Sequence, residues 1–219
     1  MKPVARSFLF RLALTIAALA LWFWTQALLG SRALRDAGIG DALHIYTSNW
    51  NSYLHLHPGA ANALLIASSA LIDAFGFFLL VSWLFGKSVR PFLGLVLLLL
   101  LRQVMQALCA LPPPEGMIWH DPGVPSALVT YSVTSDFFFS GHTAIAVFGA
   151  TEIARLHKPW LTAVAIFVVF FEIAAVIVLR AHYTMDVFTG LIAALWMAAI
   201  VERLSLPVDR FLSGAVAAK

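Results

Sequence analysis

The sequence carries little charge. Only 11% of its 219 residues are Asp, Glu, Lys or Arg, whereas a soluble domain carries about 25%. Hydrophobic residues make up 61%, and the mean hydropathy is +0.89. This composition excludes a water-soluble globular protein, and the length leaves little room for a separate soluble domain. The net charge of +3 is small and dispersed, so we expect no nucleic-acid partner.

Cysteine is almost absent as well. Cys109, inside an apolar run, is the only one, which excludes an internal disulfide and a cysteine metal site. The sequence also lacks internal repeats, low-complexity tracts and a soluble linker. Its first apolar stretch is longer than the core of a signal peptide and has no clear cleavage site. We therefore expect this stretch to be retained as a membrane span.

Long apolar runs dominate what is present. Six are close to the length of about 20 residues that crosses a bilayer. The polar connection at 31–60 carries Tyr46, Trp50 and Tyr53, which suit a membrane interface. We predict an all-α, polytopic protein that forms a single transmembrane domain over residues 1–219, with its catalytic core at about 90–205. The expected spans are 8–29, 61–85, 91–111, 139–155, 160–179 and 184–204.

Basic residues indicate the orientation of these spans. If the N-terminus lies inside, the inner segments hold ten Lys or Arg and the outer segments hold three. Positive residues collect on the cytoplasmic side, so both termini are expected there. The fourth span then begins, and the fifth ends, on the outer face.

Two polar motifs stand at those outer ends. The first is Ser140-Gly141-His142-Thr143, and the second is His182-Tyr183-Thr184-Met185-Asp186. Ionisable groups at membrane depth are costly and tend to be functional. In a helix, His182 and Asp186 share one face, so the carboxylate could accept the N–H of one ring nitrogen. The other ring nitrogen would then be a base or a nucleophile.

These residues suit phosphoryl transfer through histidine. His182 would attack a lipid phosphorus, Asp186 would orient and stabilise the ring, and His142 would exchange a proton with the alcohol oxygen. Gly141 would let the backbone approach the phosphate, and backbone N–H groups at the start of this helix could bind it. Ser140 could also be a plain helix cap.

A metal centre is the rival use of the histidines. His55, His57 and His120 could join the motif residues as ligands, but their spacing matches no familiar metal motif. The residues require neither a metal nor a cofactor. The roles of Asp73, Glu115 and Glu172 stay open.

Together the two motifs resemble the type 2 phosphatidic acid phosphatase superfamily. Within it they look most like sphingomyelin synthases and the plant phosphatidylcholine:diacylglycerol cholinephosphotransferases. The similarity covers about residues 90–190 and includes Arg102 in the third span and the stretch Leu111-Pro112-Pro113-Pro114. Asp136, six residues before His142, matches an acidic position of sphingomyelin synthases.

The resemblance implies particular site residues. His182 would be the nucleophile, Asp186 its partner and His142 the acid and base, at a non-cytoplasmic active site. The positions expected to bind substrate are Arg102, Asp136, Ser140, Gly141, Arg180 and Tyr183.

The sequence departs from the phosphatase members at two basic positions. Arg90-Pro91 is present, but the Lys of their Lys-x6-Arg-Pro motif is missing. Val176 stands where they carry an Arg six residues before the last His. Such basic residues hold a dianionic terminal phosphate. Their absence favours a phosphodiester substrate, and Arg180 could partly replace them.

We therefore expect a lipid head-group phosphotransferase. A phospholipid donor, such as phosphatidylcholine or phosphatidylethanolamine, would give its phospho-head-group to diacylglycerol or ceramide through a phosphohistidine. The alternatives are a lipid phosphate phosphatase and a non-catalytic membrane protein or transporter. We also expect the protein to lie in a bacterial inner membrane, with its active site facing the periplasm. A homodimer is expected as well.

Overall fold

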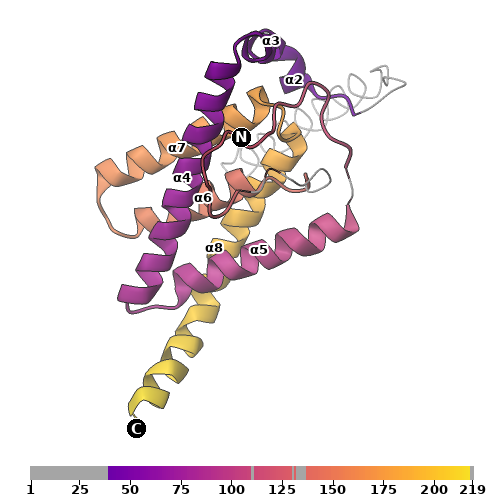
Figure 1. Ribbon diagram of the computed structural model, residues 1–219. Helices are drawn as coiled ribbons and strands as arrows, with labels where there is room; N and C mark the ends of the chain where they lie inside the picture. Colours follow the sequence, from indigo (N-terminus) through magenta and orange to yellow (C-terminus); the bar gives the residue numbers. More distant parts are fainter. Residues whose placement is uncertain (1–38, 110, 130, 132–136, 218–219) are drawn as a thin grey trace, which may run out of the picture. The chain divides into compact units, whose positions relative to one another are not determined.

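The computed structural model describes residues 39–109, 111–129, 131 and 137–217, with side chains as far as 211. All regular structure in these ranges is helical, which confirms the all-α class for them (Figure 1). The first expected span, 8–29, lies outside the described residues. Residues Asp41–Lys219 form one compact unit, separate from Met1–Gly40. The helices are α2 (Ala42–Tyr46), α3 (Ser48–Leu56), α4 (Pro58–Phe85), α5 (Arg90–Leu108), α6 (Gly141–Ala154), α7 (Pro159–Val178) and α8 (Thr184–Ala217).

Four of these helices are long and apolar enough to cross a membrane. They are α4, α5, α7 and the Thr184–Phe211 part of α8, and they confirm four of the expected spans. Helix α5 ends at Leu108 rather than at the expected 111, because Pro112 disfavours helical conformation in the residue before it. Helix α8 continues past the expected end at 204 and includes Pro207.

The expected span 139–155 is a short helix. Helix α6 has 14 residues, or about 21 Å, against a hydrocarbon core of about 30 Å. It packs against α4, α5, α7 and α8, and nine of its residues are buried. Glycine allows this close packing: a Cβ on Gly94 would overlap the ring of Phe148, and one on Gly149 would overlap the ring of Phe75. Because neighbouring helices surround α6, it does not have to match the bilayer thickness.

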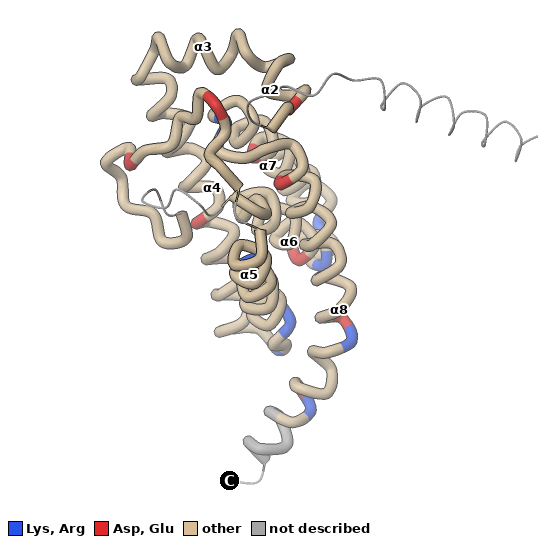
Figure 2. Tube along the Cα trace, turned by 90° about the vertical axis from the view of Figure 1, so that its right-hand side faces the viewer, with Lys and Arg blue, Asp and Glu red and all other residues tan. Residues whose placement is uncertain are grey.

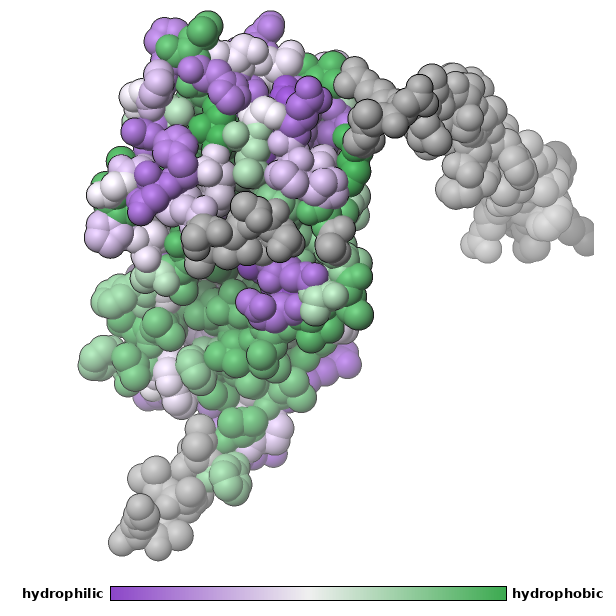
Figure 3. Space-filling view, turned by 45° about the vertical axis from the view of Figure 1, so that its right-hand side comes forward, coloured by the Kyte–Doolittle hydropathy of each residue, from purple (hydrophilic) through white to green (hydrophobic). Residues whose placement is uncertain are grey.

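The surface separates an apolar band from a polar cap. Large apolar side chains are exposed on α4, α5, α7 and α8, including Phe77, Phe167 and Phe188. Figure 3 shows this band on the face in view, below a more hydrophilic end formed around α2 and α3. The expected polar connection therefore contains two short helices, and Tyr46 and Trp50 are exposed on them at 81% and 68%.

Basic residues gather at the opposite end of the compact unit (Figure 2). Buried Arg90 pairs there with Glu152, and its Nη2 donates to Ala198 O at 3.2 Å. Arg155 Nη1 lies 2.7 Å from Glu202 Oε2, which also lies 3.2 Å from Arg90 Nε. Arg90 of α5 therefore joins Glu152 of α6 to Ala198 and Glu202 of α8.

Candidate active site

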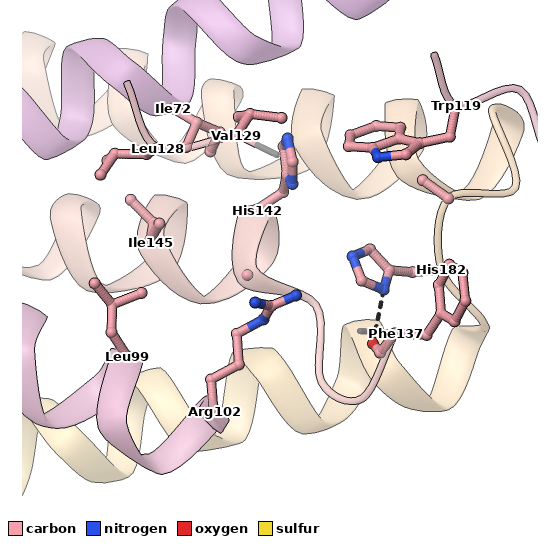
Figure 4. A pocket seen from close by; sticks show the side chains of 12 residues that line it. Ile72, Leu99, Arg102, Trp119, Leu128, Val129, Phe137, His142, Ile145 and His182 are labelled. Atoms are coloured by element: carbon pink, nitrogen blue, oxygen red, sulfur yellow. Dashed lines mark hydrogen bonds between the residues drawn. The ribbon is translucent and has the colours of Figure 1, made fainter. Parts of the chain in front are cut away.

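The two histidine motifs meet at one cavity of about 60 Å³, although they are 40 residues apart in the chain (Figure 4). Helix α5, the start of α6 and the turn before α8 contribute its polar side chains. The lining residues with polar or backbone groups for chemistry are Arg102, Gly141, His142 and His182. The remaining walls are Ile72, Leu99, Trp119, Leu128, Val129, Phe137, Ile145 and Ala181.

One hydrogen bond sets the tautomer of His182. The ring is only 6% exposed, and its Nδ1 lies 2.9 Å from the carbonyl oxygen of Phe137. A carbonyl can only accept, so Nδ1 carries the hydrogen of the neutral ring and Nε2 has a free lone pair. Figure 4 shows Nε2 directed away from Phe137, into the space bordered by His142 and Arg102. His182 therefore presents a nucleophilic nitrogen to the cavity.

Asp186 holds a different position from the one the sequence suggests. It is fully buried, and its Oδ2 accepts the backbone N–H of Tyr183 at 2.9 Å, which caps the first turn of α8. The same oxygen lies 3.8 Å from His182 Nδ1, an ion-pair distance rather than a hydrogen bond. The acceptor that orients His182 is thus the Phe137 carbonyl, and the carboxylate is a nearby negative charge.

His142 stands in the first turn of α6. Its ring is buried, and its Nε2 has no hydrogen-bond partner within the described ranges. The preceding Ser140 is fully buried and is the N-cap: its Oγ accepts the Thr143 N–H at 3.3 Å. Ser140 thus has the second role that the sequence allowed for it, that of a helix cap. The N–H groups of Gly141 and His142 precede the capped one and are therefore able to bind an anion at the positive end of the helix.

Arg102 brings a positive charge to the same cavity. Its Nε donates to Phe139 O at 2.9 Å. A Cβ on Gly141 would lie 3.1 Å from this Nε, so the missing side chain allows the guanidinium to pass close to the start of α6. Figure 4 shows Arg102 reaching toward the gap between the two imidazoles.

Besides the cap residue Ser140, two expected substrate-binding residues lie outside the cavity lining. Arg180 donates to Glu115 O at 2.6 Å and to His44 O at 3.3 Å. Tyr183 donates to Pro112 O at 3.1 Å. Both tie the turn before α8 to neighbouring segments. Asp136, the third expected residue of this kind, lies outside the described residues.

Two residues of the polar cap, which the sequence analysis did not assign to the site, support His182. His44 is buried, and its Nε2 donates to the backbone carbonyl of His182 at 3.0 Å. Asp41 caps α2 and also accepts the N–H and the hydroxyl of Thr184, each at 2.6 Å. Burial alone would raise the pKa of Asp41, but the bonds from Thr184 and the nearby His44 outweigh burial and lower it.

The acidic residues whose roles the sequence leaves open have structural partners. Asp73 accepts hydrogen bonds of 2.9 Å from Ser126 Oγ and from the N–H groups of Ala127 and Leu128, which holds one wall of the cavity against α4. Glu172 is fully buried and accepts from Ser68 Oγ at 2.6 Å. Glu115 contributes its backbone carbonyl to Arg180.

Comparison with known proteins assigns the chain to a family. A sequence model of the AtPDCT1/2 family matches residues 40–203, well over half of the chain. The chain belongs to this family. Its members are phosphatidylcholine:diacylglycerol cholinephosphotransferases, which transfer phosphocholine between these lipids. Of the two branches that the motifs resemble, the match is to the cholinephosphotransferases, and the chain is a membrane-bound lipid head-group phosphotransferase.

The solved structure of Aquifex aeolicus LpxE supports the fold. It covers 65% of this chain and 85% of its own, at 19% identity and a TM-score of 0.50. At this identity the similarity shows the fold alone. No curated protein matched the sequence.

Arg90, the part of the phosphatase pattern that this cholinephosphotransferase keeps, lies away from the cavity. Arg90 belongs to the ion-pair cluster with Glu152, twelve residues and about 18 Å along α5 from Arg102. It does not line the cavity, so it is not available to bind a second phosphate charge there.

Metal ligands do not converge in the described part of the chain. No group of three His, Cys, Asp or Glu side chains is placed to hold an ion there. His55 and His120 bond instead to Gly116 O and to Asn62 Oδ1, at 3.2 and 2.7 Å.

Proposed function

We propose that this chain transfers phosphocholine from phosphatidylcholine to diacylglycerol through a phosphohistidine at His182. The observation that carries the proposal is the bond from His182 Nδ1 to Phe137 O, which fixes the tautomer whose Nε2 lone pair is free and directed into the cavity. Family membership supports the two lipid substrates.

The first half of the reaction forms the intermediate. The lone pair of His182 Nε2 attacks phosphorus, and the bond from phosphorus to the glycerol oxygen breaks. His142 gives its proton to the departing oxygen, which produces diacylglycerol. Arg102 and the first N–H groups of α6 stabilise the charge on the phosphate oxygens. Asp186, 3.8 Å from Nδ1, stabilises the positive charge that develops on the His182 ring.

The second half reverses these steps with another lipid. His142 takes the proton of an incoming diacylglycerol hydroxyl, the oxygen attacks phosphorus, and the phosphorus–nitrogen bond breaks. Bonds of the same type are broken and made, so the exchange needs no nucleotide. Among the described residues that line the cavity, a single Arg is present, which suits a phosphodiester with its one negative charge.

We also propose how the chain crosses the membrane and on which side the site lies. The six spans, with α6 as the fourth, would place both termini in the cytoplasm and the site on the opposite side, as one domain with its catalytic core at about 90–205. The gathering of Lys87, Arg155, Lys158 and Arg203 near the inner ends of the helices supports this orientation. A homodimer remains a prediction. The family model is named for plant enzymes and lends no support to the expected bacterial inner membrane.

Acceptor dependence tests the proposed function. Purified protein in mixed micelles receives unlabelled phosphatidylcholine and diacylglycerol with labelled acyl chains, because exchange between unlabelled lipids would be invisible. We expect labelled phosphatidylcholine with the wild type and none with His182→Ala, and a smaller loss with Asp186→Asn. Free phosphate released from phosphatidic acid without an acceptor, and no labelled phosphatidylcholine, would instead establish a phosphatase.

A further inference from the structure

The cavity has three chemically different sides. Figure 4 shows Arg102 and Trp119 on opposite sides of the gap between His142 and His182. Aliphatic residues lie beyond His142, on the side away from His182. They are Ile72, Leu99, Leu128 and Ile145. A positive, an aromatic and an aliphatic side thus surround the two imidazoles.

This arrangement orients a phosphodiester. In an in-line displacement, the leaving oxygen lies opposite the attacking His182 nitrogen, so the diacylglycerol part lies toward the aliphatic side. The remaining substituents of phosphorus point sideways. Arg102 attracts the charged oxygens, which leaves the alcohol of the head group on the opposite side, where Trp119 borders the cavity.

Trp119 is held in a fixed position. Its ring centroid lies 5.3 Å from that of His142 and 4.9 Å from that of Tyr131. The Tyr131 hydroxyl is bonded to Ser69 of α4. The preceding residue, Ile118, donates its N–H to Leu179 O at 2.8 Å. The aromatic side of the cavity is therefore ordered before a ligand arrives, which lowers the entropy cost of binding.

The chemistry of this side favours one kind of cation. A quaternary ammonium has no N–H group to donate, and it binds to aromatic faces, with Trp the strongest of them. A primary ammonium requires hydrogen-bond acceptors. Among the described residues that line the cavity, none is Asp or Glu.

We propose that Trp119 forms the head-group subsite and binds the quaternary ammonium of phosphocholine, in preference to a primary ammonium. This inference rests on the proposed function, because it assumes that His182 attacks the phosphorus of the same molecule. It makes Trp119 a specificity-determining residue that neither family membership nor the sequence motifs assign.

The test compares two donors in four proteins. Transfer to labelled diacylglycerol is measured with phosphatidylcholine and with phosphatidylethanolamine, for wild type, Trp119→Leu, Trp119→Phe and Trp160→Leu. The last is a matched control, because Trp160 is 65% exposed at the start of α7. We expect Trp119→Leu to lower the choline-to-ethanolamine rate ratio by about two- to thirtyfold, the range of one cation–π contact. Trp119→Phe should keep part of the ratio, and Trp160→Leu all of it.

Equal loss with both donors would overturn the inference, because Trp119 would then only position His142. An unchanged ratio in Trp119→Leu would overturn it as well. Binding of glycerophosphocholine and glycerophosphoethanolamine, measured by equilibrium dialysis in maltoside, separates the two proposals. In one outcome the wild type prefers the choline ligand, Trp119→Phe weakens this preference, and the wild type has no transferase activity. That outcome would support the subsite and reject the proposed function. Transferase activity without any choline preference would support the proposed function and overturn the subsite.

Discussion

The reactivity of His182 depends on which ring nitrogen carries the hydrogen. The Phe137 carbonyl fixes that hydrogen on Nδ1, and the bond from His44 to the His182 carbonyl holds the backbone at the same point. The sequence predicts the imidazoles, because polar groups in apolar surroundings are conspicuous. It could not predict Phe137, because a backbone carbonyl has the same chemistry at every residue. It does not single out His44, because a histidine in a polar connection has no distinguishing pattern.

Removing the His44 bond should reduce turnover without removing the chemistry. One neutral hydrogen bond contributes about 0.5–1.5 kcal/mol, so His44→Ala should lower kcat by about two- to tenfold and change KM less. His57→Ala is the matched control, since its ring bonds only locally, to Tyr53 O at 2.8 Å. Initial rates in mixed micelles over a range of donor concentrations give both constants. An effect on KM alone would contradict a positioning role.

Asp41 predicts a dependence of stability on acid. Its pKa is lowered in the folded protein, so the stabilisation is present above the unfolded value of about 3.9 and is lost as the pH falls through the folded value. The difference in melting temperature between wild type and Asp41→Asn should therefore be constant from about pH 7 to 5 and shrink below about pH 4. Thermal unfolding in detergent measures it, with Asp121→Asn as control. A difference that grows on acidification would refute this account.

Among the elements, α6 positions the site although it is shorter than the four helices that are long enough to cross a membrane. Its N-terminus carries Gly141 and His142 to the cavity. Its Gly149 leaves room for the Phe75 ring of α4, and its own Phe148 packs against Gly94 of α5. Hydropathy predicted a full span here, because it detects apolar runs and not what surrounds them. The apolar residues Phe137 and Phe139 precede the Ser140 cap, so the apolar run is longer than the helix. The other described spans were predictable because lipid-exposed helices have to match the bilayer.

Adding one methyl group at the α4–α6 contact should destabilise the bundle. A Cβ on Gly149 would overlap the Phe75 ring, and overpacking of this kind costs about 1–3 kcal/mol. Gly59→Ala is the control, because a Cβ there meets nothing within 4 Å and alanine favours a helix. We expect a lower melting temperature in detergent for Gly149→Ala and an unchanged or higher one for Gly59→Ala. Equal melting temperatures would show that α4 and α6 are less closely packed.

At the scale of the whole molecule, charge and polarity divide the compact unit along the helices. The cluster of Arg90, Glu152, Arg155 and Glu202 lies at one end, and the cap of α2 and α3 at the other. The count of basic residues along the sequence predicted this separation. It could not show that Arg90 is enclosed in the cluster, because the Glu202 that completes it is distant in sequence.

Single cysteines can establish the orientation. In a Cys109→Ser background, Lys158→Cys should react with a membrane-impermeant maleimide only after the membrane is permeabilised. His120→Cys, at the other end, should react in intact cells or in vesicles of the same orientation. Both replaced side chains are exposed, so access and not burial decides labelling. If only Lys158→Cys were labelled in intact cells, the orientation would be the opposite of the proposed one.

The most direct measurement is the search for phosphocholine on His182. Wild-type protein is incubated with phosphatidylcholine in the absence of diacylglycerol, quenched in base, where phosphohistidine is stable, and digested for mass spectrometry. We predict a phosphocholine adduct on His182 that disappears when diacylglycerol is added, and none in His182→Ala. Transfer that continues in His182→Ala, or an adduct on another residue, would contradict the account.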